Sequence, residues 1–168
     1  MPRFFPMLRW FVFRSALGFT QIELMVAILV AGILAAIAAP NLAPWLRQQQ
    51  VNAALNQIDQ AIQETQSEAL KRNRGCSISL TRGTEVTLTG TCLVTGPRTL
   101  KGVRLDHSRS NATWVISFNA AGENRSPGND PGTLWLSAPS VQSKCLVISV
   151  GIGLRRTGQY RNNVCITP

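Results

Sequence analysis

Side chains suited to catalysis or metal binding are scarce in this chain of 168 residues. It has one histidine and one tyrosine. It has 8 acidic residues and 17 Lys and Arg, which gives a formal net charge of +9. No GxSxG, HExxH or phosphate-loop motif accompanies His107, which we interpret with Asp106 as a polar surface pair. We therefore expect no enzyme activity, no metal and no cofactor.

Charge is also absent from Leu24 to Ala39, and the apolar character continues to Leu46 apart from one asparagine and two prolines. A helix that crosses a membrane needs about 20 such residues. Residues 1–18 contain three arginines and no acidic residue, so the positive-inside rule puts the N-terminus in the cytoplasm and the rest of the chain outside. We expect a helix over 19–74 that spans the membrane to about residue 46.

A single carboxylate, Glu23, stands at the head of the apolar run. An acid in a membrane helix is costly to bury, and such residues usually have a function and a partner. The alternative is a secretory signal peptide with its cleavage site at 36–38 and a mature N-terminus near Ala39, but the apolar core of a signal peptide has no use for an acid.

The segment Gly18-Phe19-Thr20-Gln21-Ile22-Glu23-Leu24 resembles the processing site of type IV pilins and pseudopilins. The resemblance implies that prepilin peptidase cleaves after Gly18, methylates Phe19 and leaves the helix anchored in the inner membrane. It also implies that Glu23 pairs with the terminal ammonium of a neighbouring subunit during filament assembly. The implied partners are other pilin subunits and the inner-membrane assembly machinery.

The helical pattern resumes after Pro44 with apolar residues at spacings of 4, 3, 4, 3 and 4. This is the stripe of an amphipathic helix that packs on a globular head, with Gly75 as its stop signal. The stripe consists of Val51, Leu55, Ile58, Ile62, Thr65 and Ala69.

Past Gly75 the pattern changes to short β-type runs separated by turn-forming residues. We therefore expect an α+β pilin fold with three parts: a cleaved leader over 1–18, a long helix over 19–74 and a β-rich head over 75–168. The predicted strands are Cys76–Arg82, Glu85–Leu88, Thr91–Val94, Val103–Asp106, Thr113–Asn119, Thr133–Ser137, Cys145–Ile152 and Asn163–Thr167.

All four cysteines lie in the part predicted to be outside, where disulfides form. Of the three possible pairings we favour Cys76 with Cys92 and Cys145 with Cys165, because each pair brackets an expected hairpin. A zinc site is the alternative, but the sequence has no CxxC pair and only His107 as a nitrogen ligand.

The C-terminal segment is basic, with four positive and no negative side chains from Lys144 to the end. We expect Arg155, Arg156, Tyr160 and Arg161 in the loop between the last two strands. Arginine forks can bind phosphates and a tyrosine can stack on a base, so this loop is a candidate site for double-stranded DNA. A solvated loop, or a contact with another pilus subunit, is the alternative.

This region also resembles the FimT and GspH group of minor pilins and pseudopilins, whose heads are β-rich with a C-terminal hairpin. Some FimT-type members bind DNA during natural transformation through a Gly-Arg-x-Arg motif. Here the matching place reads Gly153-Leu154-Arg155-Arg156, with Arg156 at the same spacing from the glycine. The resemblance implies a minor pilin of a type IV pilus with a DNA-binding loop, or a GspH-like pseudopilin of a type II secretion system.

Overall fold

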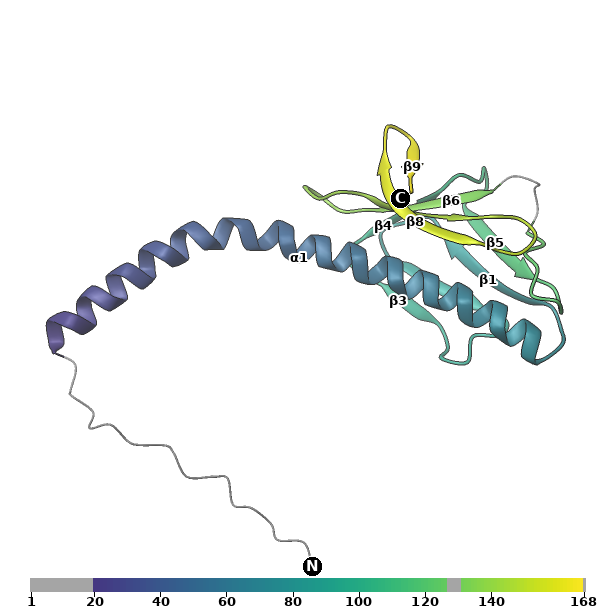
Figure 1. The fold of residues 1–168 in the computed structure, drawn as a ribbon, viewed down its shortest axis with the longest axis horizontal. Coiled ribbons are helices and arrows are strands. Elements are labelled where there is room, and N and C mark those ends of the chain that lie inside the picture. The colour runs from purple at the N-terminus through teal and green to yellow at the C-terminus, as the bar shows by residue number, and fades with distance from the viewer. Residues whose placement is uncertain (1–19, 127–130, 168) are drawn as a thin grey trace, which may run out of the picture. The chain divides into compact units, whose positions relative to one another are not determined.

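The computed structural model describes residues 20–126 and 131–167, apart from the side chains of 37–41. Within these residues the chain forms one helix followed by nine strands (Figure 1), which confirms the α+β prediction. The chain divides into two compact units, Met1–Pro40 and Asn41–Pro168, and each is described by itself. The leader, the processing residues Gly18 and Phe19 and the loop over 127–130 lie outside the described residues.

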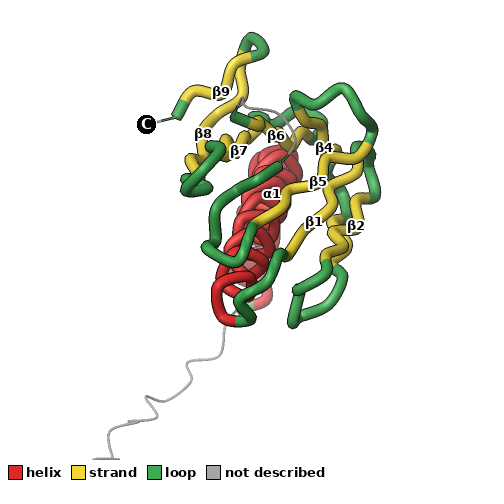
Figure 2. Tube along the Cα trace, turned by 90° about the vertical axis from the view of Figure 1, so that its right-hand side faces the viewer, coloured by secondary structure: helices red, strands yellow, loops and turns green. Residues whose placement is uncertain are grey.

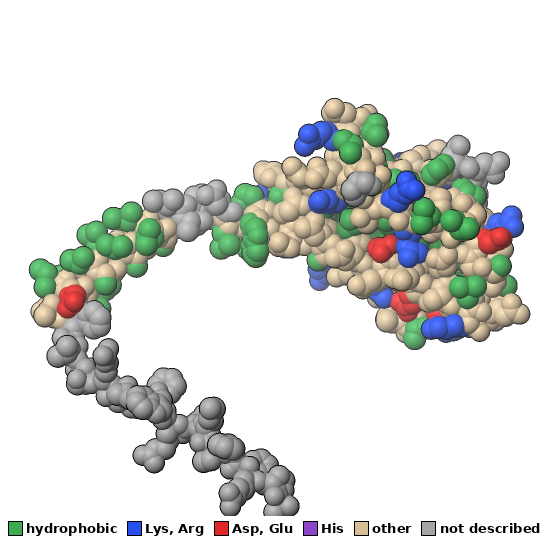
Figure 3. All heavy atoms as spheres, in the orientation of Figure 1, with side chains coloured by type: hydrophobic (Ala, Val, Ile, Leu, Met, Phe, Trp, Pro, Cys, Tyr) green, Lys and Arg blue, Asp and Glu red, His purple; other side chains and the backbone are tan. Residues whose placement is uncertain are grey.

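The helix α1 runs from Gln21 to Lys71, close to the predicted range. Its described side chains from Gln21 to Ala36 are all exposed, and Figure 3 shows hydrophobic side chains along this stretch. Among the described residues, no helix is found that has both the length and the apolarity to cross a membrane. The predicted span to about residue 46 is therefore not identified in the part of the chain that the structure describes.

The second half of α1 carries the buried stripe that the spacing predicts. All six of its members are buried, together with Ala54 and Ala61. Thr65 is tolerated there because its hydroxyl donates to the carbonyl of Ala61 at 2.8 Å, which satisfies the polar group inside the helix. In Figure 2 the strands of the head arc around this part of the helix.

Two antiparallel sheets complete the head, in the orders β3-β2-β1-β5 and β4-β6-β7-β8-β9. Inward apolar residues alternate with outward ones along the longer strands, so each sheet buries one face. Isolated bridges between Gly83 and Leu105, and from Asn124 to Phe118 and Gly151, connect strand ends. The strands are β1 (Cys76–Thr81), β2 (Val86–Gly90), β3 (Arg98–Leu100), β4 (Arg104–His107), β5 (Thr113–Phe118), β6 (Gly132–Ser137), β7 (Lys144–Ile148), β8 (Arg155–Arg161) and β9 (Val164–Ile166).

Seven of the eight predicted strands have a counterpart, but Thr91–Val94 does not. There the ladder stops because Glu64 of α1 accepts hydrogen bonds from the backbone N–H groups of Val94 and Thr95, at 2.7 and 3.0 Å, and from the Arg98 guanidinium at 2.6 Å. Burial alone would raise the pKa of the Glu64 carboxyl, but these hydrogen bonds and the Arg98 charge lower it overall. The chain after β2 is thus held on the helix instead of continuing a strand.

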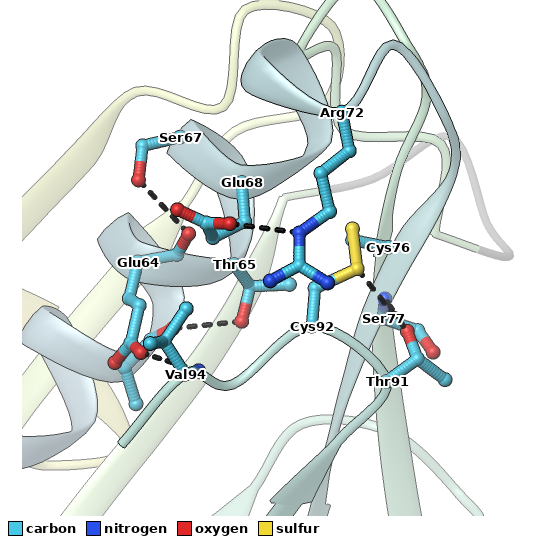
Figure 4. The surroundings of a disulfide bond; sticks show 11 residues. Glu64, Thr65, Ser67, Glu68, Arg72, Cys76, Ser77, Thr91, Cys92 and Val94 are labelled. Carbon is cyan, nitrogen blue, oxygen red and sulfur yellow. Dashed lines mark hydrogen bonds and ion pairs between the residues drawn. A yellow bond between two sulfur atoms is a disulfide. The ribbon is translucent and has the colours of Figure 1, made fainter. Parts of the chain in front are cut away.

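Both predicted disulfides are confirmed, Cys76–Cys92 and Cys145–Cys165. The first bridges β1 to the turn after β2, beside the ion pair between Arg72 Nε and Glu68 at 2.8 Å (Figure 4). The second joins β7 to β9 and so encloses two successive hairpins, where the sequence suggested one.

The interpretation of His107 as a surface residue was wrong. Its side chain is buried, with its ring centre 5.9 Å from that of Trp114 and its Nε2 3.3 Å from the carbonyl of Ala112. His107 is the last residue of β4, and the alternation of that strand turns it inward with Leu105. Burial lowers the pKa of this imidazole below its ordinary value.

Candidate functional site

The N-terminus of α1 is capped by two reciprocal hydrogen bonds between Thr20 and Glu23. The Glu23 backbone N–H donates to the Thr20 hydroxyl at 3.3 Å, and the Thr20 backbone N–H donates to the Glu23 carboxylate at 3.4 Å. This is a capping box, which satisfies N–H groups that have no partner within the helix. Its Thr-x-x-Glu signature lies within the segment Gly18 to Leu24 and was not recognised as a cap from the sequence.

The four C-terminal residues predicted to form a loop lie instead in the strand β8. The two strands β8 and β9 are joined by a tight turn at Asn162 and Asn163, whose φ angles of 51° and 62° are those of a two-residue hairpin. Figure 1 shows this hairpin projecting from the rest of the head. The strand alternation therefore separates residues that the sequence reading had grouped in one loop.

Arg155 faces the helix and is already paired. Its Nε lies 2.8 Å from the Asp59 carboxylate, and a second guanidinium nitrogen donates to Gln66 at 2.9 Å. Only 19% of its side chain is exposed. Arg155 thus holds β8 to α1, and it does not join Arg156 in one basic cluster.

Tyr160 lies on the opposite, outer face of the sheet, stacked on Trp135 of β6. The two ring centres are 4.4 Å apart and the planes differ by 3°. Beside the stack is a hollow of about 430 Å³, which is lined by this aromatic pair together with Ser108, Thr133, Val147, Asn163, Val164 and Cys165.

Arg156 and Arg161 are exposed, and neither has an ion pair within residues 20–126 and 131–167. They are five positions apart in one strand, which corresponds to about 16 Å. Because the separation is odd, alternation directs them to opposite faces: Arg156 shares the outer face with Tyr160, and Arg161 shares the face of Arg155. These two arginines are the cations of the predicted set that remain available to an anion.

Metal chemistry has no site in the part of the chain that is described: no group of three His, Cys, Asp or Glu side chains there could hold an ion. All four cysteines are used in the disulfides.

A comparison with solved structures addresses the fold. The crystal structure of the type IV minor pilin FimU from Pseudomonas aeruginosa strain PAO1 matches this chain with a TM-score of 0.52 and 15% sequence identity. The fold is pilin-like. The match covers 73% of this chain and 97% of that one, so the shared architecture includes nearly all of the solved minor pilin. No family model matches the chain, and no curated protein matches it significantly.

Proposed function

We propose that the protein is a minor subunit of a type IV pilus. The observation that carries this proposal is the pilin-like fold, found in a chain whose segment from Gly18 to Leu24 resembles a prepilin processing site. An exposed apolar stretch of α1 on such a chain is the kind of surface that packs against other subunits or lipid.

In this proposal the subunit is anchored in the inner membrane before assembly, with its head in the periplasm. The uncharged run from Leu24 to Ala39 is the anchor. Prepilin peptidase cleaves after Gly18 and methylates Phe19, which removes the leader arginines and creates a cationic terminus. The inner-membrane assembly machinery then moves the subunit into the filament.

Glu23 is the proposed assembly residue. Its carboxylate is exposed, and within the described residues its hydrogen bonds are long ones to Thr20, at 3.4 and 3.5 Å. An ammonium from a neighbouring subunit, brought into the same apolar surroundings, would bind this carboxylate more strongly than the threonine does, because an ion pair is less screened there than in water. Pairing at one fixed position would set the stagger between adjacent helices.

The test is the mass of the mature N-terminal peptide, measured on the full-length protein in a host that makes type IV pili. The proposal predicts a peptide that begins with N-methylated Phe19, in both membranes and sheared filaments. A Gly18→Trp variant, with a bulky residue at the cleavage site, should keep its leader and stay out of the filaments. A mature N-terminus near Ala39 would instead identify a secreted protein with an ordinary signal peptide and would contradict the proposal.

A GspH-like pseudopilin of a type II secretion system is the alternative, since the same N-terminal segment serves both filament types. Deleting the gene separates the two. Loss of pili or of twitching supports the pilus subunit, whereas retained pili with a block in the export of folded proteins supports the pseudopilin.

DNA binding during natural transformation is a second candidate function. The observation in its favour is that Arg156 and Arg161 are exposed and unpaired within the described residues, on a strand that also carries the Tyr160 stack. Each phosphate contact adds to the salt dependence of DNA affinity.

The DNA test uses the full chain in detergent and a fluorescent duplex, titrated at about 50 and 200 mM salt. Replacing Arg156 and Arg161 together by Gln should weaken binding and flatten the salt dependence. The matched control replaces two exposed cations elsewhere, Arg74 and Lys101, by Gln. Arg155 is left intact because its loss would disturb the head. An equal loss in both double variants would show that net charge, and not this strand, determines the affinity.

A further inference from the structure

One edge of β8 is without a strand partner over part of its length. The backbone hydrogen bonds Ser149 N–H to Leu154 and Tyr160 N–H to Ser143 show that the even-numbered residues of β8 direct their backbone groups toward β7. In an antiparallel strand the intervening residues direct theirs the other way. The N–H and C=O groups of Arg155, Thr157, Gln159 and Arg161 therefore face the side on which β9 lies.

The strand β9 covers only half of that edge. It pairs with Gln159, Tyr160 and Arg161 and not with the earlier residues of β8. It then leaves the sheet by crossing the outer face at Gly158, where a Cβ atom would lie 2.2 Å from the carbonyl oxygen of Ile166. No described residue forms a backbone hydrogen bond to Arg155 or Thr157 on the open side.

Two hollows flank this open edge on the side of the helix. One, of about 720 Å³, lies between α1 and the strands β7 to β9, with Asn52, Leu55, Lys144 and Ile166 in its wall. The other, of about 440 Å³, is lined by the Asp59–Arg155 pair, Gln66 and the loop before β8. Both hollows include Thr157. Side chains of an added strand that pointed toward the helix would thus have room.

The charges beside the edge favour an acidic occupant. Lys144 lines the larger hollow, and Arg156 is exposed on the outer face. Neither has an ion pair within the described ranges. Among the described residues, Asp59 is the only carboxylate that lines either hollow, and it is bound to Arg155. An added strand places successive side chains on alternate faces, so acidic residues on either one of its faces would meet a cation, Lys144 on the helix side or Arg156 on the outer side.

We infer that β8 binds an extended, acidic segment of a partner protein, which pairs with the backbone of Arg155 and Thr157 and extends the sheet. Main-chain hydrogen bonds supply affinity in this mode of recognition, and the side chains supply selectivity. An uncovered strand edge is otherwise a liability for aggregation. The inference concerns a site that the assembly proposal does not use, so either can fail without the other.

The experiment uses the isotope-labelled full chain in detergent micelles and two synthetic peptides, acetyl-Thr-Glu-Val-Glu-Thr-Glu-Val-amide and its counterpart with Lys in place of Glu. We expect the acidic peptide to bind about tenfold more tightly. Its binding should slow hydrogen exchange of the Arg155 and Thr157 amides. The Arg156 amide should not change, because its N–H already faces β7.

Two variants at one position separate backbone pairing from charge attraction. Thr157→Pro removes the outward N–H without removing a hydrogen bond to β7, and edge strands tolerate such a proline. We expect this variant to bind the acidic peptide about tenfold more weakly. Thr157→Val keeps the N–H and should bind as the unchanged protein does. If Thr157→Pro does not fold, hydrogen exchange in the unchanged protein tests the backbone pairing by itself, because pairing should protect the Arg155 and Thr157 amides.

Three results would overturn the inference. The first is no binding of the acidic peptide at millimolar concentration. The second is binding that protects neither the Arg155 nor the Thr157 amide, or that persists in a folded Thr157→Pro variant. The third is selective binding of a DNA duplex with no binding of the acidic peptide, which would assign Arg156 and its surroundings to nucleic acid.

Discussion

Two stretches of the same helix differ completely in their surroundings. From Gln21 to Ala36 every described side chain is exposed, including large apolar ones such as Ile28 and Leu34. From Val51 to Ala69 the apolar side chains, apart from the exposed Ala53, are buried against two sheets. The comparison shows that apolar composition alone does not make a core: the second stretch is periodic and packs on sheets of the same chain, whereas the first is apolar on all sides and is exposed among the described residues.

The largest expected effect is on the free energy of unfolding, when one apolar residue in each stretch is truncated and the two losses are compared. Ile62→Ala should lower the free energy of unfolding by about 2 to 5 kcal/mol, because it leaves a cavity in a packed core. Ile28→Ala, at an exposed position, should change it by less than about 0.5 kcal/mol. Denaturant unfolding of the full chain in a mild detergent measures both. Equal losses would show that the first stretch is packed within the subunit.

Both disulfides belong to the head and none to the exposed stretch of α1. Replacing Cys145 and Cys165 by Ser should cost about 3 kcal/mol of unfolding free energy, and the same change at Cys76 and Cys92 a similar amount, since the closed loops are alike in length. Circular dichroism should then show loss of strand signal at lower denaturant. A variant with unchanged stability would contradict a stabilising role for its disulfide.

A smaller difference in stability is expected between substitutions of the neighbouring Arg155 and Arg156 in β8. Arg155→Gln leaves Asp59 without its ion pair and should destabilise the head by about 1 kcal/mol. Arg156→Gln should have almost no effect, because that side chain is exposed and has no ion pair within the described residues. Parallel urea titrations compare the two. A larger loss at Arg156 would mean that the faces of β8 are assigned wrongly.

The smallest effect is a pH dependence from His107. Burial lowers the pKa of its imidazole, so below about pH 6.5 the unfolded chain binds a proton that the folded chain does not. The free energy of unfolding should therefore fall as the pH drops below 6.5, until the pH passes the lowered pKa of the folded state. His107→Gln should remove this slope, and as the only histidine it makes the comparison direct. A slope unchanged by the substitution would assign it to other groups.

The elements that could be predicted are those with a local signal. The stripe from Val51 to Ala69 has helical spacing, and the cysteine pairs are close in sequence, so both predictions are confirmed. The strand β8 was missed because its sequence RRTGQYR has no alternation of apolar residues. One of its faces binds polar groups of α1, and the other carries one aromatic residue.

The remaining errors arise from tertiary contacts that no local pattern shows. The ladder after β2 ends because of Glu64, which is some 30 residues earlier in the chain. His107 is buried because of the strand and the tryptophan that lie beside it. The basic residues of the candidate site were placed in a loop because the Asn162-Asn163 turn, which joins β8 to β9, was not recognised.

The most direct test of the assembly proposal counts the subunit in sheared filaments for Glu23→Ala and Thr20→Ala in the full-length protein. Both variants break the capping box, but only the first removes the carboxylate. We predict that Glu23→Ala lowers incorporation about tenfold or more with its membrane level unchanged, whereas Thr20→Ala, which loses a cap worth about 1 kcal/mol, has a much smaller effect. Incorporation of Glu23→Ala at the level of the unchanged protein would contradict the account.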